Sequence, residues 1–296
     1  MNFRLISVTA LVSICLAIPV FAQDTSLQSN NSHREISLGL GVPEAIDFHG
    51  HVGVALGTFP DYQGSKDMSI VGMALADVRQ DDFLFIQGAS VNPNDGYGSV
   101  GWSALNFKYG ENGAEKFTLS LGPVIRFHRG RDEDDNTALN GIGDIDDSAG
   151  SGVFLEANLG NWSADISSIS QDVGEAGDGI FVAFRSGYTI KLDDRTSITP
   201  GVFTTWGDDD YMQGFFAVNS SQALQTGLPE FEAESGIKDV GLQITTTYSL
   251  SKKLLISGQI GYQRLLGDAA DSPVLGSSNN GSDNQFRALF GFSFQF

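Results

Sequence analysis

The chain has 296 residues, is 41% hydrophobic and carries a formal net charge of −19. This acidic balance excludes a nucleic-acid partner, because binding nucleic acid requires a cationic surface that neutralises phosphates. The hydrophobic content, which includes 21 Phe, excludes a disordered chain of similar charge.

Residues 1–22 are predicted to form a secretory signal peptide that is absent from the mature protein. Arg4 precedes an apolar run, and Val20 and Ala22 occupy the small-residue positions before the expected cut. The run is shorter than the roughly 20 apolar residues of a membrane-spanning helix. The single cysteine, Cys15, lies in this segment, so disulfides, thiolate metal sites and cysteine nucleophiles are excluded from the mature chain.

Residues 23–46 separate this signal from the first regular strand. The stretch "EISLGLGV" (35–42) alternates between apolar and polar or small residues, as a strand does. We expect residues 23–46 to form an N-terminal periplasmic arm, a plug or an extension of the first strand. The sequence leaves these three alternatives open.

The stretch "DFHGH" (47–51) contains the only close pair of histidines. On a strand, Asp47, His49 and His51 point to the same side. Two imidazoles and a carboxylate can form a zinc site. We favour the alternative that they line a polar interior at the mouth of the first strand.

Period-two alternation recurs from residue 48 to the last residue. In "VGLQITTTYSL", for example, Val240, Leu242 and Ile244 alternate with Gly241 and Gln243. Short and long links between the strands alternate along the chain, as in outer-membrane barrels. We expect twelve strands, near residues 48–58, 68–78, 82–91, 101–109, 116–128, 150–159, 162–170, 179–190, 196–206, 238–250, 253–265 and 285–296.

The predicted fold is all-β, a single antiparallel transmembrane barrel over residues 47–296. The strands reach about 10 residues, near the length that a tilted transmembrane strand requires. In hydrocarbon, unpaired backbone groups are so costly that only a closed ring of strands is stable. The final segment, "FRALFGFSFQF" (286–296), would turn its phenylalanines toward lipid, and its terminal aromatic residue would be recognised by the barrel-assembly machinery. We therefore expect an outer-membrane protein of a Gram-negative bacterium, in contact with lipid and lipopolysaccharide.

Polar residues in mid-strand mark the expected interior of this barrel. Twelve strands enclose more space than the packed interior of an eight-stranded barrel. The polar side chains could line a narrow channel or interlock as a plug, and both alternatives stay open. The charged lumen candidates are Arg126, Glu156, Arg185 and Arg287.

Acidic clusters in the long loops are the most conspicuous polar feature. The pattern after Asp132 begins like a calcium-binding loop, but Thr137 and Gly143 replace the Gly and Glu that such a loop requires, which excludes an EF-hand. The clusters form either a solvated rim or a surface that shares divalent cations with lipopolysaccharide phosphates. The candidates for cation bridging are Asp132, Asp134, Asp135, Asp144, Asp146, Asp147, Asp208 and Asp209.

The sequence predicts neither an enzyme nor a bound cofactor. It contains no GxSxG and no HExxH motif. Outside the expected signal, the histidines are His33, His49, His51 and His128. We interpret His128, which lies beside three arginines, as a rim residue rather than a general base.

Several stretches resemble one family, the MipA/OmpV outer-membrane proteins. They are "FPDYQGSKD" (59–67), "LGPVIRFHRGRDEDDN" (121–136), "GIGDIDDSAG" (141–150), "TWGDDDYMQGFF" (205–216), "GIKDVGLQI" (236–244) and "RLLGDAADSPVLG" (264–276). The resemblance implies a scaffold that brings a lytic murein transglycosylase and a murein synthase, a penicillin-binding protein, together at the outer membrane. The competing hypotheses are a small passive diffusion pore and an adhesin that acts through the acidic outer loops. A periplasmic partner could reach only the short turns, the interior or residues 23–46.

Overall fold

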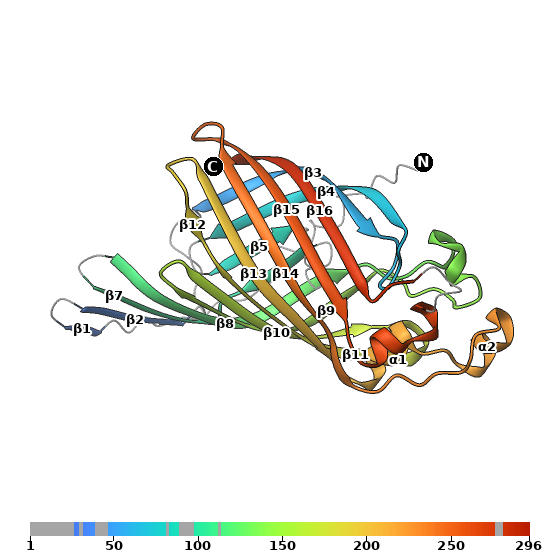
Figure 1. The fold of residues 1–296 in the computed structure, drawn as a ribbon. Coiled ribbons are helices and arrows are strands. Elements are labelled where there is room, and N and C mark those ends of the chain that lie inside the picture. Colours follow the sequence, from blue (N-terminus) through green and yellow to red (C-terminus); the bar gives the residue numbers. More distant parts are fainter. Residues whose placement is uncertain are drawn as a thin grey trace.

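Antiparallel strands close into a ring in the computed structural model, which describes residues 27–29, 32–38, 47–80, 83–88, 98–111, 114–275 and 281–296. The expected signal peptide, residues 1–22, lies outside the described residues. The ring contains twelve strands and closes through two pairings, β16 with β3 and β8 with β9 (Figure 1). In spatial order the strands are β3 (Phe48–Pro60), β4 (Met68–Gln80), β5 (Leu84–Gly88), β6 (Gly98–Trp102), β8 (Ala114–His128), β9 (Ser148–Leu159), β10 (Trp162–Asp172), β11 (Asp178–Tyr188), β13 (Thr196–Gly207), β14 (Gly236–Ser249), β15 (Leu254–Leu265) and β16 (Asn284–Gln295).

The predicted strands agree with these bounds to within a few residues, except in two places. The strand expected over 82–91 is described only as β5, over Leu84–Gly88. The strand expected over 101–109 is divided into β6 and β7 (Leu105–Glu111), both of which pair with β8. At the break, the Ser103 amide donates to the Phe83 carbonyl at 2.7 Å. The Trp102 carbonyl approaches Gly122 so closely that a Cβ there would lie 1.8 Å from it, so only glycine fits.

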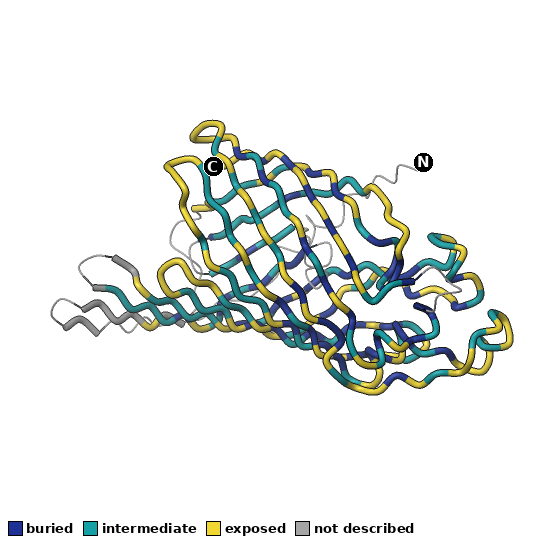
Figure 2. The backbone as a smooth tube through the Cα atoms, viewed as in Figure 1, coloured by how far each residue is buried: buried dark blue, intermediate teal, exposed yellow. Residues whose placement is uncertain are grey.

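The last strand has one apolar and one interior face, as the sequence predicted. Its phenylalanines point outward, and Arg287, Leu289 and Ser293 are buried between them. The same alternation of exposed and buried residues follows the other ring strands (Figure 2). Because the exposed positions are mostly large and apolar, the barrel presents a hydrophobic outer band.

A sheet extension projects from the end of the barrel that carries the short turns. We use this name for β1 (Leu27–Ser29), β2 (Ser32–Leu38) and β7, which pair in this order and continue onto β8. β5 begins opposite Trp102, and β7 adds 7 residues beyond that level, or about 23 Å at roughly 3.3 Å per residue. Figure 1 shows the extension at the lower left, where it projects to the left beyond the rest of the barrel. Within residues 23–46, the described part therefore extends the sheet along β7.

The long loops at the opposite end contain helices that the sequence analysis did not predict. They are α1 (Asp209–Phe216), α2 (Ser220–Thr226), α3 (Asp268–Asp271) and the 3₁₀ turns η3 (Glu133–Asp135), η4 (Thr137–Leu139), η5 (Gly174–Ala176) and η6 (Pro273–Leu275); the remaining short strand is β12 (Ile190–Lys191). Asp208 caps α1 by accepting from the Tyr211 amide at 2.9 Å. Asn219 and Gln222 form a capping box at α2. In the described part of the chain, every helix is too short or too polar to cross a membrane.

Candidate functional site

A network of buried polar side chains crosses the outer half of the barrel interior. Lys238 Nζ lies 3.3 Å from Asp239 Oδ2, 3.2 Å from the Tyr211 hydroxyl and 2.9 Å from Gln63 Oε1. Gln263 Nε2 donates to the same Asp239 oxygen at 2.7 Å, and Arg287 Nη1 donates to Gln263 Oε1 at 2.5 Å. Both Lys238 and Asp239 are at most 1% exposed. The charges of Lys238 and Asp239 therefore compensate each other inside the protein, as buried charges must.

A hydrophobic loop core covers this network at the outer mouth. We use this name for the cluster of buried apolar residues from the loops and from interior positions of the strands, among them Leu139, Met212, Phe215 and Phe216. Tyr211 joins the two layers, because its ring packs against Phe215 at 5.0 Å while its hydroxyl accepts from Lys238. Met212 and Phe216 are 1% and 0% exposed. Within the described residues, packed side chains thus close the outer half of the barrel.

The sequence-predicted lumen residues all point inward but do not form one group. Arg126 and Arg287 are buried in the closed outer half, at 4% and 7% exposure. Glu156 and Arg185 line a separate cavity of about 270 Å³ near the short turns, which we call the vestibule. The cavity lies near the short turns because two of its lining residues, Asn158 and Ser163, flank the turn between β9 and β10.

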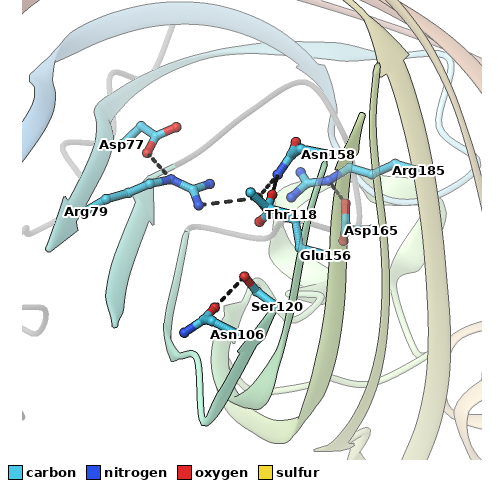
Figure 3. A network of polar contacts seen from close by, with 9 residues as sticks. All are labelled: Asp77, Arg79, Asn106, Thr118, Ser120, Glu156, Asn158, Asp165 and Arg185. Carbon is cyan, nitrogen blue, oxygen red and sulfur yellow. Dashed lines mark hydrogen bonds and ion pairs between the residues drawn. The ribbon is translucent and has the colours of Figure 1, made fainter. Parts of the chain in front are cut away.

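Ion pairs and amides hold the charged groups of the vestibule (Figure 3). Arg79 on β4 donates from Nε to Asp77 at 3.3 Å and from Nη1 to Glu156 at 3.4 Å. Arg185 pairs with Asp165 on the neighbouring strand. Asn158 Nδ2 donates to Glu156 at 3.0 Å and to the Thr118 hydroxyl at 3.2 Å. The sequence analysis did not select Arg79 or Asp165, although both occupy the polar positions of alternating strands.

Many carboxylates of the acidic clusters organise the outer loops. Asp132, Asp144 and Asp147 each accept a backbone N–H within their own loop, at 2.8–2.9 Å. Asp135 forms an ion pair with Arg129 at 2.6 Å. Asp208 caps α1, and Asp209 accepts from the Ser235 amide at 2.6 Å. Asp134 and Asp146 line a cavity of about 590 Å³ between the start of β4 and the loop after β8.

The acidic residues of the outer loops include the candidate cation ligands. In the described part of the chain, no group of three His, Cys, Asp or Glu side chains could hold a metal ion. Cation bridging to lipopolysaccharide therefore stays a prediction.

Two titratable groups of the outer loops have pKa values shifted by burial. Burial lowers the pKa of Arg131 to about 10, so this guanidinium remains cationic beside the aspartates at neutral pH. Burial, with Asp67 and Asp61, raises the pKa of the Tyr62 phenol to about 12.

The histidine pair lies near the end of β3 where the short turns gather. His49 is paired across the strands with Arg79, and His51 with Asp77. Both share the strand face of Ala55, which is buried inside the barrel. The pair thus lies on the interior strand face at this mouth of the barrel, with His49 exposed and His51 half-buried.

A closed antiparallel barrel with an apolar outer band, short turns at one end and long loops at the other is an outer-membrane β-barrel protein. The sequence model of the MltA-interacting protein MipA family matches residues 52–296. The chain belongs to this family.

Solved structures with similar folds include outer-membrane proteins of low sequence identity. OmpT of Vibrio cholerae is 10% identical, with a TM-score of 0.38 over 92% of this chain and 99% of that one. The NanC porin is 9% identical, with a TM-score of 0.43 over 83% of this chain and 100% of that one. An outer membrane channel from Pseudomonas putida F1 is 14% identical, with a TM-score of 0.41 over 86% and 99%. No curated protein sequence matches the chain.

Replacing Phe290 with Arg is expected to destabilise the barrel by about 2–4 kcal/mol, because this position lies in mid-strand and faces hydrocarbon. The free energy of unfolding in phospholipid vesicles, measured by urea titration, checks this value. Phe296→Arg is the control, since Phe296 lies at the strand end, where the expected cost is only about 0–1 kcal/mol. Equal costs at both positions would contradict the lipid-facing orientation of β16.

Proposed function

We propose that this protein is a non-enzymatic outer-membrane scaffold that docks a lytic murein transglycosylase on the periplasmic side. The sheet extension carries this proposal, because it adds a platform at the end with the short turns, which face the periplasm in outer-membrane barrels. The partner is suggested by the family description, MltA-interacting protein. A penicillin-binding protein would join the same assembly from the periplasm, and the terminal Phe296 would serve the barrel-assembly machinery during insertion.

The extension offers a binding mode that needs no deep pocket. In the described pairings, β1 is the last strand, with β2 as its only partner. An edge strand presents unpaired backbone N–H and C=O groups that a strand of another protein can pair with. Since the extension ends in such a strand, a transglycosylase segment can add to it by β-augmentation.

Deleting residues 23–46 is expected to abolish capture of the transglycosylase by the protein in lipid nanodiscs, because both β1 and β2 are removed. Deleting only residues 23–31, which removes β1 and leaves β2 on β7, should weaken capture without changing the barrel. Surface plasmon resonance with the soluble transglycosylase measures both effects.

The matched control changes the opposite end of the barrel. Replacing α2 with a flexible linker of equal length alters the outer loops and leaves the extension intact. This variant should capture the transglycosylase as well as the wild type does. Undiminished capture by the 23–46 deletion would refute docking through the extension, and capture lost only in the α2 variant would assign it to the loops.

A further inference from the structure

The vestibule contains an ion pair that spans the barrel interior. Arg79 lies on β4 and Glu156 on β9, and β5, β6 and β8 separate these strands along the wall. The contact between Nη1 and Oε1 is 3.4 Å, and the second contact of Arg79, with Asp77, is 3.3 Å. Both exceed the usual range of about 2.7–3.2 Å for N–H···O hydrogen bonds. The side chains are 33% and 19% exposed, so a solute in the cavity can reach both charges.

We propose that the vestibule binds a small zwitterionic solute of the dipeptide class, which exchanges the Arg79–Glu156 ion pair for two ion pairs with its own termini. The ligand carboxylate pairs with Arg79, and the ligand ammonium pairs with Glu156. This inference does not rest on the scaffold proposal.

Charge balance selects a zwitterion over the other ligand classes. A simple anion on Arg79 would leave the Glu156 carboxylate without its cation inside the barrel, and a simple cation on Glu156 would leave Arg79 with Asp77 as its remaining ion-pair partner and gain no second ion pair. Unpaired charges in a low-dielectric interior are costly. A neutral solute gains no ion pair in exchange for the one it disturbs. A molecule that carries both an anionic and a cationic group compensates the charges of both Arg79 and Glu156.

The remaining groups of the cavity suit the body of such a ligand. Asn158 holds the Glu156 carboxylate in place from the same strand. Gln243 also lines the cavity. Its Oε1 is buried and has no hydrogen-bond partner among the described residues, so a turn of this amide toward the cavity would give a ligand N–H an acceptor. A volume of about 270 Å³ equals roughly nine water molecules at about 30 Å³ each, enough for a dipeptide with small side chains.

The side from which a solute can reach the vestibule follows from the closure of the outer half of the barrel. The loop core and the buried network fill the barrel on the side of the long loops, whereas the vestibule lies next to the short turns. Through the part of the barrel that the structure describes, a solute therefore enters from the periplasm and does not pass to the exterior.

Isothermal titration of the detergent-refolded mature protein with L-alanyl-L-alanine tests the proposal. We expect saturable binding that weakens at least about tenfold when the dipeptide is acetylated and amidated at its ends. Acetate and ethylammonium should bind similarly weakly. Arg79→Gln and Glu156→Gln should each weaken dipeptide binding about tenfold, whereas Lys252→Gln, in an exposed turn, should leave it unchanged.

The ligand series uses the wild-type protein, so its result does not depend on whether the variants fold. Absence of saturable binding at millimolar dipeptide would overturn the proposal. Equal binding of acetate and dipeptide would overturn it too, by reducing the vestibule to an anion site. Equal binding of the capped and free dipeptides would show that the terminal charges are not recognised.

Discussion

Replacing Lys238 with Met is expected to lower the free energy of unfolding by about 3–5 kcal/mol, because it leaves the Asp239 carboxylate buried without its cation. The substitution keeps most of the side-chain volume, so the loss reports charge compensation rather than packing. Urea titration in phospholipid vesicles, followed by tryptophan fluorescence, measures the effect.

Two further variants separate this explanation from a general sensitivity to substitution. In Lys238→Met/Asp239→Asn neither member of this ion pair is charged, and the amide oxygen can still accept from Gln263 Nε2; part of the stability should return, although the buried Arg287 then loses the Asp239 charge. Lys252→Met removes a lysine from an exposed turn and should change the free energy by less than about 0.5 kcal/mol. A double variant as unstable as Lys238→Met alone would contradict a role for the ion pair.

The strand pattern could be predicted from the sequence because each ring strand has one lipid face and one interior face. Phe290 and Phe292 point outward and Arg287 inward, and this alternation is fixed by the pleat of the strand alone. The break between β6 and β7 could not be predicted in this way. It depends on the close contact between Trp102 and Gly122, which are 20 residues apart and meet only in the folded sheet.

The closed outer mouth was missed although local signals were present. Asp208 precedes a helix that buries Tyr211, Met212, Phe215 and Phe216, the spacing of an amphipathic helix with an N-cap. We interpreted the acidic residues there as a solvated rim or as a surface that shares divalent cations, and did not foresee that Asp208 and Asp209 accept hydrogen bonds from backbone amides. Glu156 was predicted to face the interior and lines the vestibule, but its partner Arg79 could not be identified from the sequence. Pairing across a barrel depends on how far the strands are staggered on closure, which period-two alternation does not encode.

The refolded wild-type protein is expected to be silent in planar bilayers, because the loop core and the buried network close the outer half of the barrel. Phe216→Asp places a carboxylate at a position that is 0% exposed, which should open the loop core and produce discrete current steps. Single-channel recording at constant voltage measures both. Leu224→Asp introduces the same charge on α2, where the side chain is 88% exposed, and should remain as silent as the wild type.

These recordings also decide between the scaffold and the passive pore, since a diffusion pore requires a continuous water path. Regular openings of the wild type, unchanged in Phe216→Asp, would mean that ions bypass the loop core, and the pore would become the better hypothesis. If only Phe216→Asp conducts, the channel is closed by packing of the loops. Within the described part of the chain, the accessible interior is then the vestibule, which lies at the same end of the barrel as the sheet extension. Solute binding and partner docking would therefore share one face of the membrane, and neither would require transport across it.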